Sequence, residues 1–175
     1  MKREFLEMLG RSVTREEPSD RPLSDEEAEG VRFALRERER RTQELWGLFE
    51  GAASEIEEAL GETRGLWHGS PEPTDWSAEI RAVFAYGPRT ATIRIAGAPT
   101  ELPLQRALLG GIFARGAITL GTADKLAGAL PLHLIAGQDG QARWATLQGE
   151  SYTLLGEGQI ERLFGWLLLE EAAGV

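Results

Sequence analysis

The sequence predicts an α+β fold: an antiparallel sheet of about five to six strands, flanked by helices and preceded by a long N-terminal helix. Three observations lead to this class. Apolar residues recur at seven-residue spacing between residues 28 and 60. From residue 78 the period changes to two, with turn residues between the alternating segments. Helical 3,4 spacing then returns over residues 157–171.

The long helix is predicted over residues 23–61, after a charged, proline-containing arm at residues 1–22 that we expect to be flexible. Ser24 can cap the first turn, and Glu27 stands three residues later, at the spacing of a capping box. Gly61 is a suitable stop signal. A continuous helix of this size is longer than a small domain can cover.

The heptad pattern and the length of this helix indicate that it packs on a partner, and the simplest partner is a second copy of the chain. Arg38 and Thr42 interrupt the apolar seam, and Gly30, Gly47 and Gly51 weaken the helix. The alternative is two shorter helices with a break near Gly47, the second packing on its own domain. The residues expected at a dimer interface are Val31, Leu35, Leu45, Trp46, Phe49, Ala52 and Ile56.

The remaining residues, 62–175, form the predicted α+β domain. Strands are expected at 80–86, 90–96, 117–120, 130–136 and 141–148, with hairpin turns at Gly87-Pro88 and Asp139-Gly140. Helices are expected at 104–113 and 157–171. Residues 63–77 and 149–153 are expected to be loops, and 123–129 a short helix or loop.

Composition excludes several kinds of chemistry. There is no cysteine, so disulfides, thiolate metal sites and thiol nucleophiles are excluded. No apolar run approaches the roughly 20 residues of a membrane span, and none of signal-peptide length follows the N-terminus. We therefore expect a cytoplasmic protein that makes no membrane contact, with neither a metal nor a cofactor.

The net charge is −9, and residues 42–175 carry 17 acidic and nine basic side chains. An acidic body repels phosphate backbones, so we expect no direct nucleic-acid binding. The arginines at 36–41 alternate with Glu37 and Glu39, which is typical of a solvated helix face.

Three segments resemble a GAF domain, the sensor module related to PAS domains. They are residues 111–120, a helix end running through Arg115-Gly116 into a strand; residues 129–141, an apolar-proline-leucine strand with its hairpin turn; and residues 152–169, a loop and amphipathic terminal helix. The resemblance covers roughly residues 44–172. It implies a regulatory sensor, often dimeric through flanking helices. The Asn-Lys-Phe-Asp-Glu signature of cyclic-nucleotide-binding members is missing, as are the cysteines of bilin-binding and sulfoxide-reducing members. A roadblock-type adaptor is a related possibility.

The resemblance and the strand positions together suggest a small-ligand site formed by Phe84, Tyr86, Arg94, Phe113 and His133. Arg94 alternates with isoleucines, so it is either a solvent-facing arginine or an anion-binding arginine at a pocket mouth. His133 is a mid-strand histidine that is either structural or part of the site. No residue stands in a nucleophile or phosphate-loop motif.

Three functions remain open at the level of sequence. The first is a non-catalytic regulatory or sensor module, a homodimer that binds a small ligand or an unknown protein partner and acts in trans. The second is a pure protein-interaction protein, such as an adaptor, immunity protein or anti-activator, without a ligand. The third is a hydrolase that uses His68 with Asp75, or His133.

Overall fold

A computed structural model describes residues 21–61, 67–69, 75–149 and 151–168 of the chain. The α+β class, the long first helix and the antiparallel sheet are confirmed. The elements follow in the order α2 (Asp25–Leu60), β1 (Trp67–Gly69), β2 (Ile80–Tyr86), β3 (Arg89–Ile95), α3 (Leu102–Leu108), β4 (Ile112–Thr122), β5 (Lys125–Ala136), β6 (Ala142–Gln148), β7 (Ser151–Leu154) and α4 (Glu157–Leu168).

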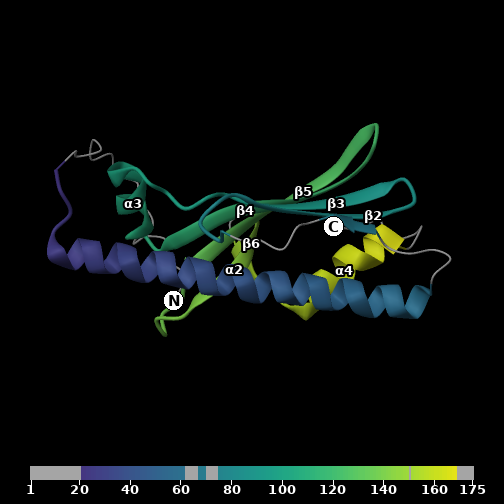
Figure 1. Ribbon diagram of the computed structural model, residues 1–175, viewed down its shortest axis with the longest axis horizontal. Coiled ribbons are helices and arrows are strands. Elements are labelled where there is room, and N and C mark those ends of the chain that lie inside the picture. Colours follow the sequence, from purple (N-terminus) through teal and green to yellow (C-terminus); the bar gives the residue numbers. More distant parts are fainter. Residues whose placement is uncertain (1–20, 62–66, 70–74, 150, 169–175) are drawn as a thin grey trace.

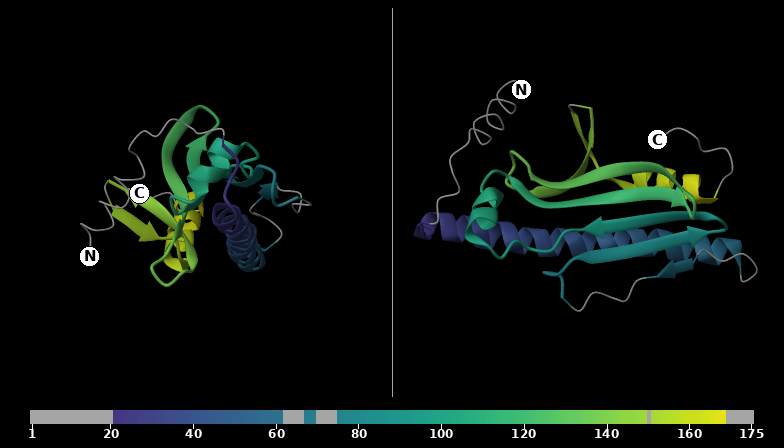
Figure 2. Two further views of the ribbon diagram at one scale, coloured as in Figure 1. Left: turned by 90° about the vertical axis from the view of Figure 1, so that its left-hand side faces the viewer. Right: turned by 90° about the horizontal axis from the view of Figure 1, so that it is seen from above.

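The seven strands form one antiparallel meander, because each strand pairs with the next one along the chain. The sheet curves around the two longer helices, and α2 and α4 lie on the same face of it (Figures 1 and 2). α2 contacts β4 and β6, whereas α4 contacts β2 and β3. We call the face covered by α2 and α4 the inner face, and the opposite face the open face.

α2 begins and ends where the sequence predicts. The Ser24 side chain accepts a hydrogen bond from the Glu27 amide (3.2 Å), and the Ser24 amide donates to the Glu27 carboxylate (2.8 Å). Hydrogen bonds from Arg21 and from Ser24 lower the pKa of Glu27 to about 2. Gly61 follows the last turn with a φ of 68°, which favours glycine. The helix is continuous past Gly47, so the alternative with a break there is wrong.

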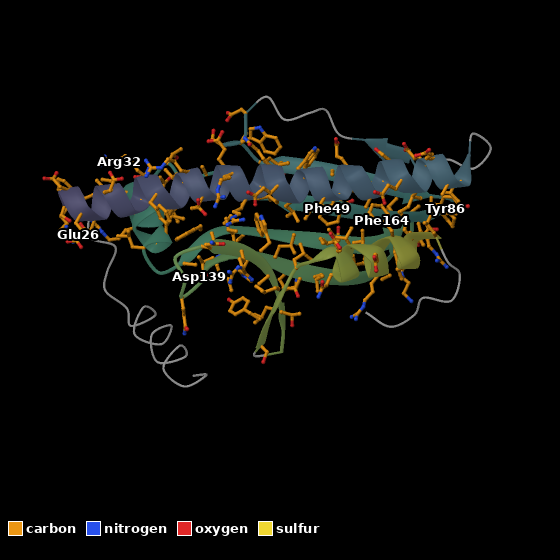
Figure 3. The ribbon with its side chains drawn as sticks, turned by 90° about the horizontal axis from the view of Figure 1, so that it is seen from below. Glu26, Arg32, Phe49, Tyr86, Asp139 and Phe164 are labelled. Atoms are coloured by element: carbon orange, nitrogen blue, oxygen red, sulfur yellow. The ribbon has the colours of Figure 1, made fainter. Side chains whose placement is uncertain are left out.

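The apolar seam of α2 packs against the sheet of its own chain. Among the residues assigned to a dimer interface, Val31, Leu45, Trp46 and Phe49 are buried in the core, and Leu35, Ala52 and Ile56 are partly buried against it. The ring of Phe49 lies 6.1 Å from that of Phe84. Figure 3 shows Phe49 and Phe164 on the inner face of the sheet. The heptad pattern therefore no longer requires a second copy, and the homodimer stays a prediction.

The two polar interruptions of the seam are buried as well. Arg38 is 2% exposed and Thr42 is 0% exposed. The Arg38 guanidinium donates hydrogen bonds to the carbonyl oxygens of Trp76 (2.6 Å) and Ala96, and the Thr42 hydroxyl donates to the Arg38 carbonyl (2.6 Å). Burial lowers the pKa of Arg38, while Asp75 and Glu39 favour its charged form. Arg38 thus ties α2 to the chain before β2 and after β3.

Two short strands lie where the sequence predicts loops. β1 falls within 63–77, and β7 falls largely within 149–153, so the described part of the chain forms a sheet of seven strands rather than five or six. Strands of three and four residues give too few alternations to be recognised from a pattern. β1 pairs with β2, and β7 pairs with β6.

The region between β3 and β6 also differs from the expectation. The helix predicted at 104–113 is the shorter α3, the strand predicted at 117–120 is the eleven-residue β4, and most of 123–129 belongs to β5. Gly111 has a φ of 87°, a conformation incompatible with helix continuation, so the chain turns there. Pairing of β4 with β5 along most of their length then overrides the weak helical spacing.

Replacing Arg38 by methionine keeps most of its volume but leaves two carbonyl oxygens without their donor. We expect the free energy of unfolding to fall by about 2–4 kcal/mol, because each unpaired buried polar group costs about 1–3 kcal/mol. Urea denaturation measures this. The control Arg36→Met, at an exposed position of the same helix, should change stability by less than about 0.5 kcal/mol. Equal effects of the two substitutions would contradict the role given to Arg38.

Gly47 and Gly51 are exposed in the middle of α2, and a Cβ at either position meets nothing within 4 Å. Gly47→Ala and Gly51→Ala should each raise the free energy of unfolding by about 0.5–1 kcal/mol, because alanine is the better helix former. Gly30→Ala should gain less, since its Cβ would lie 2.8 Å from a methyl carbon of Leu109. Destabilisation at Gly47 would show that another chain covers this side of α2.

Candidate functional site

The five residues predicted to bind a ligand lie on two different faces of the sheet. Phe84 and Phe113 are buried on the inner face, and Tyr86 is partly buried against the same core. Arg94 and His133 lie on the open face, at positions that alternate with the buried side chains of β3 and β5. The structure therefore does not bring the five together in one pocket.

The inner-face members of that set are packed by the chain's own helices. The Phe84 ring contacts Phe49 of α2 and Phe164 of α4, with ring centroids 6.1 and 5.3 Å apart. The Phe113 ring lies edge-on to Phe33 of α2 at 6.0 Å. Such aromatic pairs stabilise a core by about 0.5–1.5 kcal/mol beyond the area they bury. Phe84 and Phe113 therefore join the helices to the sheet.

No helix of the described part of the chain covers the open face (Figure 2). Four arginines and a histidine cross this face in a continuous diagonal, which we call the arginine band: Arg81 on β2, Arg94 on β3, Arg115 on β4, His133 on β5 and Arg143 on β6. These five strands are consecutive neighbours in the sheet.

The register of the sheet makes the band continuous. Arg81 lies directly opposite Arg94, and Arg115 lies directly opposite His133. The Ala96 amide, two residues beyond Arg94, donates to the Arg115 carbonyl (2.9 Å), so Arg94 and Arg115 are diagonal neighbours. Arg143 is diagonal to His133, since His133 pairs with Ala145. Like charges directly opposite each other destabilise a sheet.

Two carboxylates balance part of this charge. Arg94 forms an ion pair with Glu79 (3.0 Å), and Arg143 forms one with Asp139. Arg115 is exposed, and within the described ranges no ion pair or side-chain hydrogen bond is found for it. Arg115 is therefore the member of the band whose planar donor fork is open to a new partner.

His133 is held by Tyr152, whose ring lies edge-on to the imidazole at 5.6 Å. Its Nδ1 atom is buried and has no hydrogen-bond partner among the residues that the structure describes. Burial lowers the pKa of His133, and the positive charge of Arg115 lowers it further. The imidazole is thus neutral at pH 7 and adds no charge to the band.

Among the described atoms, the residues considered for a hydrolase, namely His68, Asp75 and His133, form no catalytic arrangement. Asp75 is exposed, and its carboxylate accepts hydrogen bonds from the Ser77 amide (2.8 Å) and hydroxyl (2.6 Å), which lower its pKa. The side chain of His68 lies outside the described part. Nowhere in that part do three histidine, aspartate or glutamate side chains gather closely enough to hold a metal ion. None of its helices is both long and apolar enough to cross a bilayer.

The arginine band contrasts with the second half of α2. Residues 42–60 of this helix carry five glutamates and no basic residue. Sequence reasoning singled out Arg94 and His133 but missed Arg81, Arg115 and Arg143. Each stands at a polar position of an alternating strand, and only the cross-strand register shows that the five are neighbours.

Comparison with known proteins gives no significant match: no family model, no curated protein and no solved structure is similar enough to assign the chain to a family. The GAF-like resemblance therefore stays a prediction.

The lowered pKa of His133 predicts a pH dependence of stability. The unfolded chain binds the imidazole proton more readily than the native state, so the free energy of unfolding should fall as pH drops through the ordinary histidine pKa of about 6.5. Urea denaturation near pH 8 and near pH 5.5 measures this. His133→Gln should lose less stability between the two pH values than the unaltered chain. Identical losses would show that His133 is not buried in its neutral form.

Proposed function

We propose that the protein is a non-catalytic regulatory module that docks another protein on the open face of its sheet and acts through that partner. The main support for this proposal is that the two faces of the sheet differ in what covers them. Helices α2 and α4 pack the inner face with aromatic side chains, while the open face presents the arginine band. Within the predicted regulatory role, this favours a protein partner over a small ligand behind the sheet.

Exposed side chains on the open face also suit a protein partner. Leu154 of β7 is 52% exposed, and Tyr152 is partly exposed beside His133. Arginine and tyrosine are enriched in protein–protein interfaces, where an apolar body and a polar tip are both used. Homodimerisation through α2 stays a prediction, and the proposed docking does not depend on it.

Photo-crosslinking in the cells that produce the protein tests the proposal. A benzophenone side chain introduced at Thr92 or Thr119, which are cross-strand neighbours on the open face, should give a protein adduct. The same group at Gln43, exposed on α2, is the matched control and should give none. Adducts at Gln43 alone would contradict the assignment of the open face.

Native mass spectrometry of the freshly purified chain distinguishes the protein partner from a small ligand. We expect the mass of the chain without a co-purifying small molecule, because its own aromatic rings pack the inner face. An added mass that is lost on denaturation would support the ligand-binding sensor instead.

A further inference from the structure

Arg115 stands at the centre of the arginine band, with Arg94 on one side and His133 on the other. It differs from Arg94 and Arg143, which pair with Glu79 and Asp139, in having no ion pair among the described residues. Next to it, the imidazole of His133 carries a buried Nδ1 that also lacks a hydrogen-bond partner there. The accessible group of this pair is therefore the guanidinium of Arg115.

Arg81, Arg94 and Arg115 place three guanidinium groups on neighbouring positions of the open face. Direct opposition of Arg81 and Arg94 brings like charges together, and Arg115 adds a third charge diagonally. A sheet of this acidic protein could carry neutral residues at these exposed positions at no cost to its core. The band therefore has the charge pattern of a surface that is completed by an anionic partner.

We propose that the arginine band binds an acidic, extended segment of a partner protein, with a carboxylate of that segment held by the fork of Arg115. This inference rests on the proposed function and specifies its partner. A carboxylate accepts two parallel hydrogen bonds from a guanidinium. Further along the segment, an apolar side chain would lie against Tyr152 and the exposed Leu154.

The spacing of the band fits an extended peptide. Diagonal neighbours on adjacent strands lie about 7–8 Å apart, which is the relation between Arg94 and Arg115. Alternate side chains of an extended chain point to the same side about 6.6 Å apart. Two glutamates separated by one residue can therefore reach Arg94 and Arg115 together.

Charge favours a peptide over a nucleic acid. The protein carries a net charge of −9, and carboxylates already pair with two of the four arginines in the band. A nucleic acid carries a phosphate at every nucleotide and would be repelled by the remaining acidic surface. An acidic peptide segment can instead place a single carboxylate at Arg115 without bringing a phosphate at every position.

Fluorescence anisotropy of a labelled peptide tests this inference with the full chain. The probe is a fluorescein-labelled peptide of about nine alternating glutamate and valine residues, in buffer of about 50 mM salt, where exposed charges are weakly screened. A peptide of alternating glutamine and valine is the uncharged control. We expect the glutamate peptide to bind and the glutamine peptide not to bind.

Arg115→Gln should weaken binding of the glutamate peptide at least about tenfold, as expected for loss of a bidentate charged hydrogen bond. Arg36→Gln, an exposed arginine on α2 outside the open face, should change the affinity less than about twofold. Because Arg115 is exposed, both variants should keep the circular dichroism spectrum and melting temperature of the unaltered chain.

The inference would be overturned by no binding of the glutamate peptide, by equal weakening from the two substitutions, or by Arg115-dependent binding of a labelled oligothymidylate in place of the peptide. A change of oligomeric state in Arg115→Gln with unaltered peptide binding would also overturn it, since the occupant would then be a second copy. Adducts at Thr92 or Thr119 without peptide binding would remove this inference and leave the proposed function in place. If neither the adducts nor peptide binding were found, both this inference and the proposed function would be wrong.

Discussion

The packing of one face of α2 against the sheet is the constraint on which the rest of the structure depends. A helix of 36 residues exposes its polar backbone ends at two distant points and must bury an apolar stripe along its length. The curved sheet provides the complementary surface. Arg38 fixes the helix in position by donating hydrogen bonds to carbonyl oxygens just before β2 and just after β3. Because α2 and α4 occupy one face, any docking of a partner on the sheet must use the other.

Different interactions therefore dominate on the two faces of the sheet. On the inner face, aromatic and aliphatic side chains are buried, and their contacts contribute to stability in proportion to area and fit. On the open face, the arginine band holds neighbouring positive charges whose repulsion is only partly offset by Glu79 and Asp139. Surface ion pairs of this kind contribute little to stability. The proposed docking assigns these charges a role in binding a partner rather than in folding.

Local signals predicted the ends of α2, the fold class and the two hairpin turns, because caps, alternation and turn residues act over a few positions. The heptad pattern correctly identified which side of α2 is buried but not what buries it, since periodicity contains no information about the partner surface. The sequence pattern indicated that Arg38 interrupts the apolar seam of α2, because the carbonyl oxygens that accept its hydrogen bonds lie 38 and 58 residues away. Of the arginine band, the sequence predicted only Arg94 and His133 as site residues, because the continuity of the band depends on the pairing of five strands. β1 and β7 were missed because they are too short to show a period.

The sheet of its own chain holds α2 in place, which leaves the open face for the proposed partner. Equilibrium urea denaturation of the full chain over about a 100-fold range of protein concentration tests it most directly, because the stability of an obligate dimer depends on protomer concentration. If the chain's own sheet holds α2, the midpoint does not change with concentration. A midpoint that rises with concentration would show instead that a second copy stabilises α2.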